Sequence, residues 1–127
     1  MIFRPRYVPG EEVGAYFTAA DVAIFNYRDI TDSGSLRLAC DLGTPVVATA
    51  VGSFREFLTD GVTARLVEPG DAPALVAALA AVLADPERRG ADGAARRARW
   101  LASAWSWAES AKATAALYET ITRGGAR

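Results

Sequence analysis

The residues best suited to bind a ligand lie in a polar, glycine-bearing turn, Asp32–Leu36, which reads Asp-Ser-Gly-Ser-Leu. Gly34 permits close approach of the backbone, and Ser33 and Ser35 add hydroxyl groups beside it. The turn leads into a short amphipathic segment whose first N–H groups have no partner within a helix, so they can face a phosphate. The same residues also suit an ordinary helix cap made by Asp32 or Ser33, and this turn alone leaves both interpretations open.

A second turn of the same kind, Gly52–Ser53, follows the apolar run Pro45–Thr49. Two turns that each follow a buried strand would lie side by side at one edge of a parallel sheet, which favours a ligand cleft there. Acidic side chains expected at this edge, Asp29, Asp32 and Glu56, are candidates for binding ligand hydroxyls. Their alternative roles are helix caps and solvated charges.

The composition excludes several other kinds of site. The 127 residues carry a formal net charge of −1, whereas a nucleic-acid-binding protein normally has a basic excess. The chain has no histidine, which removes Ser–His and Cys–His nucleophiles and the commonest metal ligand. Its single cysteine, Cys40, cannot form an internal disulfide or by itself a zinc site. We therefore expect no metal and no nucleic-acid partner, while Arg28, Arg37 and Arg55 could neutralise a diphosphate or lie on a solvated surface.

Helices and strands are expected to alternate through the first half of the chain. Short apolar runs typical of strands buried on both faces are Val22–Phe25, Pro45–Thr49 and Thr63–Val67, and Ile2–Phe3 resembles the remnant of another strand. Helices are expected over Glu11–Ala20, Gly34–Leu42 and Ser53–Leu58, and helices alone follow Val67. This order predicts an α/β, Rossmann-like parallel sheet flanked by helices, with a helical C-terminal third.

Local signals set the expected ends of these helices. Gly43 is placed to stop the helix that begins at Gly34. Ser53 and Glu56 fit a capping box, as do Ser106 and Glu109, which would start a last helix reaching about Ile121. Further helices are expected to begin at Asp71 and Asp85; the apolar positions of the first are Leu75, Val76, Leu79, Val82 and Leu83.

Large aromatic residues gather near the C-terminus: Trp100, Trp105, Trp107 and Tyr118. They could anchor the last helices on the core or form an interface with another domain. No apolar run is long enough to cross a bilayer and no signal core follows Met1, so a cytoplasmic location is expected.

Several segments resemble motifs of retaining glycosyltransferases of the two-lobed GT-B type, family 4 (group 1), in their C-terminal, donor-binding domain. These are Tyr16–Val22 ("Y-x-x-A-D-V"), Gly43–Thr49 ("G-x-P-V-V-A-T"), Val51–Glu56 ("V-G-G-x-P-E") and Asp60–Val67 ("D-G-x-T-G-x-L-V"). The resemblance implies transfer of a hexosyl-type group from a nucleotide-diphosphate sugar with retention. It implies no metal or other cofactor, and it allows the full enzyme to lie at the membrane periphery.

The resemblance also implies where the donor would bind. Ser33–Gly34 fall where the family's backbone contacts the donor diphosphate; the implied diphosphate- and sugar-binding residues are Asp32, Ser33, Gly34, Ser35, Leu36, Gly52 and Ser53. The family's paired glutamates would fall at Ile30 and Leu38, and neither position is acidic here. Asp29 or Asp32 is the candidate replacement, and no catalytic residue is assigned.

By the same resemblance, residues 1–127 would form one partial nucleotide-sugar-binding domain, inactive alone. Its first two strands and the acceptor lobe would belong to the N-terminal part of a parent enzyme. In the strand order 3-2-1-4-5-6, Val22–Phe25 would then present an apolar edge, through which the chain could pair as a homodimer.

Two other functional interpretations stay open. A degenerate, non-catalytic nucleotide-sugar-binding or assembly module is favoured by Ile30 and Leu38 at the positions of the paired acids. A flavodoxin-like domain fits the alternation of elements, but the sequence lacks an acidic cluster for a phospho-acceptor site.

Overall fold

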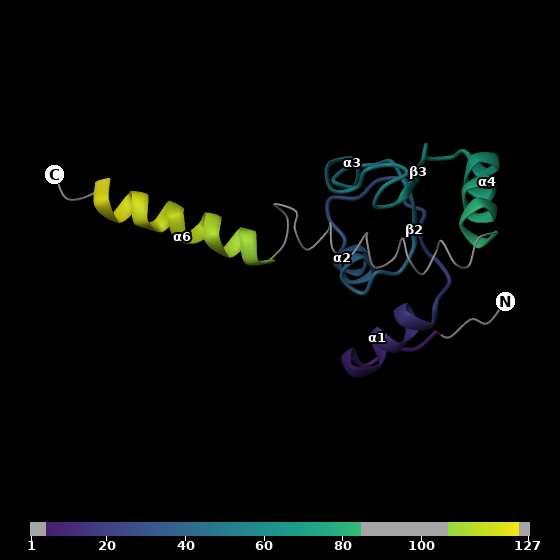
Figure 1. Ribbon diagram of the computed structural model, residues 1–127, viewed down its shortest axis with the longest axis horizontal. Coiled ribbons are helices and arrows are strands. Elements are labelled where there is room, and N and C mark those ends of the chain that lie inside the picture. Colours follow the sequence, from purple (N-terminus) through teal and green to yellow (C-terminus); the bar gives the residue numbers. More distant parts are fainter. Residues whose placement is uncertain (1–4, 85–106, 125–127) are drawn as a thin grey trace.

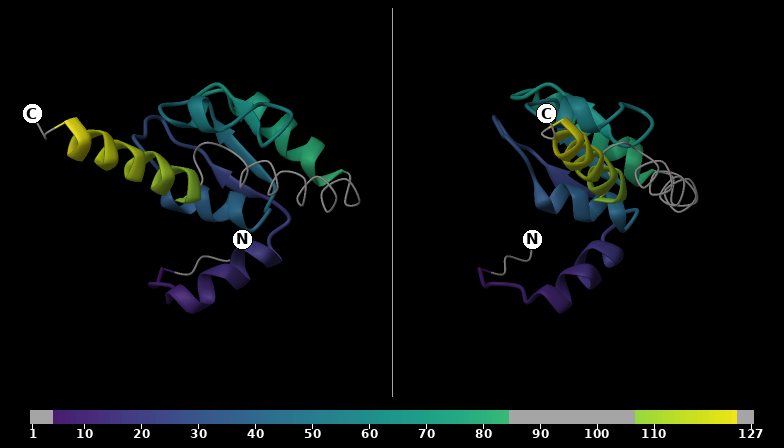
Figure 2. Two further views of the ribbon diagram at one scale, coloured as in Figure 1. Left: turned by 60° about the vertical axis from the view of Figure 1, so that its left-hand side comes forward. Right: turned by 90° about the vertical axis from the view of Figure 1, so that its left-hand side faces the viewer.

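The computed structural model describes residues 5–84 and 107–124. Three parallel strands, β1 (Ala23–Phe25), β2 (Val46–Thr49) and β3 (Arg65–Val67), form a sheet in the order β1-β2-β3. The helices are α1 (Gly10–Ala19), α2 (Gly34–Asp41), α3 (Phe54–Phe57), α4 (Ala72–Leu83) and α6 (Trp107–Gly124). Helices α2 and α4 lie on opposite sides of the sheet (Figures 1 and 2). The expected α/β fold, a parallel sheet flanked by helices, is therefore confirmed.

The middle strand and the two outer strands differ in burial. All four residues of β2 are buried. Its register with β1 is given by the pair Ala23–Val46, and its register with β3 by the pair Val47–Arg65. In β1, Ile24 is 50% exposed, and in β3 Arg65 is exposed. The prediction of strands buried on both faces is thus correct for β2 and wrong for β1 and β3. The reason is that the latter two end the described sheet, where β1 presents the expected apolar edge.

One apolar cluster holds α2 and α3 on the same face of the sheet. Phe54 of α3 is fully buried, and its ring meets those of Phe25 and Tyr27 edge-on at centroid distances of 6.2 and 5.8 Å. The buried members of the cluster are Phe25, Leu36, Ala39, Cys40, Val46, Ala48, Val51, Phe54, Leu58 and Ala64. Because both helices share this core, the turns that precede them are positioned by the same packing.

Two of the predicted helix signals are confirmed. Gly43 follows α2 with a φ of 72°, a left-handed conformation that suits glycine after a helix end. Asp71 caps α4, since its Oδ1 accepts a hydrogen bond of 2.8 Å from the N–H of Ala74.

The predicted capping box at Ser53 and Glu56 is wrong. Ser53 has a φ of −60° and a ψ of −18°, already helical, whereas a capping serine is extended so that its oxygen reaches over the helix end. The first N–H groups of α3 bond instead to backbone carbonyls, from Phe54 to Val51 at 3.0 Å and from Arg55 to Gly52 at 3.3 Å. With these donors already satisfied, the buried Ser53 hydroxyl has no hydrogen-bond partner among the described residues.

The helices of the last third are less buried than their sequence pattern suggests. In α4, Val76 is exposed, and Leu75 and Leu79 are half-buried. In α6, Trp107 is 79% exposed and Tyr118 is also exposed, so anchoring on the core is wrong for these two aromatic residues. The predictions for Ile2–Phe3, the helix from Asp85, the cap at Ser106, and the residues Trp100 and Trp105 lie outside the described residues.

Candidate functional site

The turn after β1 and the turn after β2 meet at the carboxyl edge of the sheet. Gly52 has a φ of +45°, and a Cβ atom at this position would overlap the carbonyl oxygen of Ile30. Only glycine allows the two turns to approach so closely. Ile30 comes two residues before the predicted turn Asp32–Leu36, so Gly52–Ser53 lies beside the loop that leads into that turn; this contact is a feature that the sequence did not reveal.

Thr49 attaches the loop after β1 to the end of β2. Its Oγ1 accepts a hydrogen bond of 3.0 Å from the N–H of Tyr27 and lies 2.7 Å from the Tyr27 carbonyl oxygen, to which it donates. Thr49 is 1% exposed, so these bonds are shielded from water. Sequence reasoning missed this role, although a threonine ending an aliphatic buried strand was the available signal.

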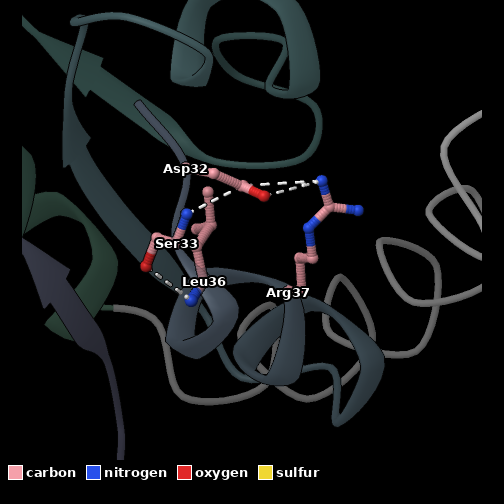
Figure 3. Close-up of polar contacts among 4 residues, drawn as sticks. All are labelled: Asp32, Ser33, Leu36 and Arg37. Carbon is pink, nitrogen blue, oxygen red and sulfur yellow. Dashed lines mark hydrogen bonds and ion pairs between the residues drawn. The ribbon is translucent and has the colours of Figure 1, made fainter. Parts of the chain in front are cut away.

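At the start of α2, Ser33 is a true helix cap. It is buried and extended, and its Oγ accepts a hydrogen bond of 3.2 Å from the N–H of Leu36 (Figure 3). This bond occupies the Leu36 N–H, and the Leu36 side chain belongs to the core. The N–H groups of Gly34 and Ser35 donate to no acceptor within residues 5–84 and 107–124. Ser33 therefore caps α2 while the N–H groups of Gly34 and Ser35 are not used by any described residue.

The space beside these two donors is open. Beyond the backbone of α2 itself, a Cβ atom on Gly34 would meet no atom of the described residues within 4 Å, and both Gly34 and Ser35 are exposed. The N-terminal end of the eight-residue helix α2 thus directs two unused donors at solvent, with the positive end of the helix dipole behind them. This geometry can bind an anion.

Asp32 and Arg37 form an ion pair next to these donors. Oδ1 of Asp32 accepts a hydrogen bond of 2.8 Å from the N–H of Ser33, and Nη2 of Arg37 lies 3.2 Å from Oδ2 and 3.4 Å from Oδ1 (Figure 3). The Arg37 guanidinium also lies over the ring of Phe57 in α3, with its central carbon 5.0 Å from the ring centroid. Asp32 is therefore engaged within the chain.

The other predicted acidic and basic side chains differ in whether they form hydrogen bonds or ion pairs with described residues. Asp29 and Glu56 are exposed, and within the described part of the chain their carboxylates make no hydrogen bond or ion pair. Arg55 contacts both carboxylate oxygens of Glu68 at 3.0 Å. Arg28 is exposed and has no ion pair with another described residue. Its charge, unlike that of Arg37 or Arg55, is not already compensated by a neighbouring carboxylate.

Two general features of the described residues bear on the kind of site. Over residues 5–84 and 107–124, no three His, Cys, Asp or Glu side chains gather as metal ligands. In the same ranges, no helix is long and apolar enough to cross a membrane.

Comparison with known proteins identifies the family. The family described as "Glycosyl transferases group 1" matches residues 2–85. The chain belongs to this family. Over 109 residues it is 36% identical to the GDP-mannose-dependent alpha-(1-6)-phosphatidylinositol monomannoside mannosyltransferase of Mycolicibacterium smegmatis, a match that covers 80% of this chain and 28% of that protein.

Other relatives agree with this assignment. The chain is 41% identical over 108 residues to the D-inositol 3-phosphate glycosyltransferase of Kribbella flavida, covering 84% of this chain and 24% of that one. Its fold matches sucrose-phosphate synthase from Thermosynechococcus elongatus with a TM-score of 0.83 and 30% identity, covering 93% of this chain and 29% of that one. The chain spans about a quarter of the length of these relatives.

Proposed function

We propose that this group 1 glycosyltransferase chain supplies part of the donor site of an enzyme that transfers a hexosyl-type group from a nucleotide-diphosphate sugar with retention. The N-terminal end of α2 carries the proposal. There the N–H groups of Gly34 and Ser35 are unused by the described residues and face open space. Family membership supplies the chemical class of the anion, a nucleoside diphosphate.

In this proposal, backbone donors stabilise the leaving diphosphate. Negative charge develops on the diphosphate as the bond to the sugar breaks, and donors that are already oriented stabilise it without reorganisation. The helix dipole of α2 stabilises a bound anion by only about 0.3–1 kcal/mol at an exposed helix end. The N–H groups must therefore act together with nearby cations. No metal is required for this step, and the turn Gly52–Ser53, packed against Ile30, borders the site where the sugar would lie.

Hydroxyl recognition is proposed for acids that make no contacts within the described chain. Ile30 packs its side chain against the core, and its carbonyl lies against Gly52, so this position serves packing. Asp29, its exposed neighbour, and Glu56 at α3 have carboxylates without partners among the described residues. These two acids are the candidates for contacts with donor hydroxyls.

A calorimetric titration with GDP, UDP and GDP-mannose tests the proposal, and the mannosyltransferase relative makes the GDP compounds the first choice. Gly34→Trp places a large side chain at the free donors, and its Cβ has room with respect to the described residues. We expect binding by the unmodified chain and at least about tenfold weaker binding by this variant, which removes about 1.4 kcal/mol or more.

Gly10→Trp is the matched control. Gly10 is also the first residue of a helix and is exposed, and an added Cβ would have no atom of the described residues beyond its own helix within 4 Å. This control should bind like the unmodified chain. No binding of any of the three compounds, or equal weakening in both variants, would contradict the proposal.

A non-catalytic nucleotide-sugar-binding module is the second candidate, favoured by Ile30 and Leu38 at the positions of the family's paired acids. Sugar transfer by a longer protein that contains this chain separates the two. Transfer that Gly34→Trp abolishes supports the enzyme, whereas donor binding without any transfer supports the module.

A further inference from the structure

The carboxylate of Asp32 is bound by the same kinds of donor that a phosphate uses. It accepts a hydrogen bond of 2.8 Å from the backbone N–H of Ser33 and lies 3.2 Å from the guanidinium of Arg37. Backbone N–H groups at a helix start and arginine are the usual partners of phosphate oxygens. Asp32 and Ser33 directly precede α2 and Arg37 is its fourth residue (Figure 3), while Gly34 and Ser35, whose N–H groups bond to no described residue, are its first two residues.

The two sides of this ion pair are held unequally. The side chain of Arg37 is 24% exposed, and its guanidinium lies against the ring of Phe57 at 5.0 Å. The side chain of Asp32 is 54% exposed, and apart from Arg37 the backbone N–H of Ser33 is its partner among the described residues. Helical side chains tilt toward the N-terminus, which keeps Arg37 near the start of α2 when its partner leaves. Asp32 is thus the partner that can rotate into water.

We propose that Asp32 is a built-in competitor of the donor: its carboxylate holds Arg37 until the donor binds, and the incoming diphosphate displaces it. The inference rests on the proposed function, because it assigns the regulation of the same anion site. The donor would then bind to the N–H groups of Gly34 and Ser35 and to the released Arg37. Arg55 does not take part in this exchange, because its carboxylate partner is Glu68, which follows β3 and is not at the start of α2.

Replacing Asp32 with asparagine tests the competition. Asp32→Asn keeps an oxygen that can accept the hydrogen bond from the Ser33 N–H and removes the charge that holds Arg37. We expect it to tighten GDP binding by about two- to fivefold, the range that an exposed ion pair contributes to an equilibrium constant. Asp32→Ser, which also keeps a short acceptor, repeats the test if the asparagine variant is not folded.

A double-mutant cycle separates competition from simple charge repulsion. Arg37→Gln alone should weaken GDP binding. If Asp32 acts by occupying Arg37, Asp32→Asn has a smaller effect when Arg37 is already glutamine. If Asp32 only repels the diphosphate, the effect is larger in that background, because Arg37 no longer compensates its charge.

Glu12→Gln is the charge-matched control. Glu12 pairs with Arg6 on the surface of α1, with 3.3 Å between the charged atoms, so this variant also removes one acid from an exposed arginine pair. It should leave GDP affinity unchanged, and unfolding midpoints of all variants verify that each is folded.

The outcomes distinguish the inference from the proposed function. Tighter binding by Asp32→Asn that depends on Arg37 supports the competitor. Unchanged affinity, or a larger effect in the Arg37→Gln background, overturns it while leaving the donor site intact. Failure of both the unmodified chain and Asp32→Asn to bind GDP overturns the proposed function and the inference with it.

Discussion

Ser33–Gly34 and Gly52–Ser53 each join the carboxyl end of a strand to a helix, and each consists of one serine and one glycine. In the first turn the serine caps α2, and the glycine lies in open space. In the second the serine hydroxyl is buried without a described partner, and the glycine is pressed against the Ile30 carbonyl. Similar turn sequences thus serve opposite purposes: one leaves donors for a ligand, and the other lets two loops pack.

The largest expected effect tests the packing role of the second turn. Gly52→Ala forces a Cβ atom into the Ile30 carbonyl oxygen at a φ of +45°, so we expect a loss of about 3 kcal/mol in the free energy of unfolding. Urea unfolding measures it. The matched Gly34→Ala has free space around its Cβ and should change stability by less than about 1 kcal/mol. Equal unfolding midpoints for the two variants would remove the distinction between the turns.

The next prediction concerns the attachment of the first turn to β2. Thr49→Val keeps the shape of the side chain but leaves the Tyr27 N–H and carbonyl without their partner, in a place that is 1% exposed. We expect a loss of about 1–3 kcal/mol in the free energy of unfolding. In the control Thr18→Val, an exposed hydroxyl bonded to its own helix is lost, and the change should stay within about 0.5 kcal/mol. Similar effects at both sites would show that Thr49 does not hold the loop.

The two serines give the sharpest contrast. Ser33→Ala removes the cap of α2 and should reduce the free energy of unfolding by about 1 kcal/mol. Ser53→Ala removes a buried hydroxyl that has no described partner, so it should be neutral or slightly stabilising. Thermal or urea unfolding of both variants provides the measurement, and an equal loss at Ser53 would indicate that its hydroxyl has a partner after all.

The smallest expected effect concerns the ion pairs that follow the two turns. Arg55 and Glu68 pair on the surface, with side chains 57% and 66% exposed, so Arg55→Gln should change the free energy of unfolding by less than about 0.5 kcal/mol. Arg37→Gln loses both Asp32 and the contact with Phe57, and about 1 kcal/mol is expected. If Arg55→Gln proved the more damaging in urea unfolding, the unequal anchoring of the two arginines would be wrong.

Sequence reasoning succeeded where a feature depends on residues close along the chain. The caps at Ser33 and Asp71 use N–H groups three residues ahead, and Gly43 ends the helix directly before it. Each is a local hydrogen bond or backbone conformation that residue type and spacing are enough to predict. The motifs that resemble group 1 glycosyltransferases likewise lie in short segments, and the family match confirms them.

It failed at Ser53 and at Ile24, for different reasons. The Ser53 and Glu56 pattern suits a cap as well as that at Ser33 does, yet Ser53 has helical backbone angles and the first N–H groups of α3 bond to the carbonyls of Val51 and Gly52, so the cap is unnecessary. Ile24 has the apolar neighbours of a buried strand residue, but its exposure depends on β1 ending the described sheet. The number of strands that flank a residue cannot be predicted from the residues next to it in the sequence.

The amino-acid sequence alone predicts an α/β domain whose first turn can offer backbone donors to an anion, because periodicity, glycines and caps act over a few residues. Only the tertiary structure decided which turn is open, that Gly52 is required by the Ile30 carbonyl, and that Arg37 is held between Asp32 and Phe57. The physical reason is that sterics and charge act between atoms that folding brings together. Asp32–Leu36 and Gly52–Ser53 therefore look alike as sequences and differ as sites.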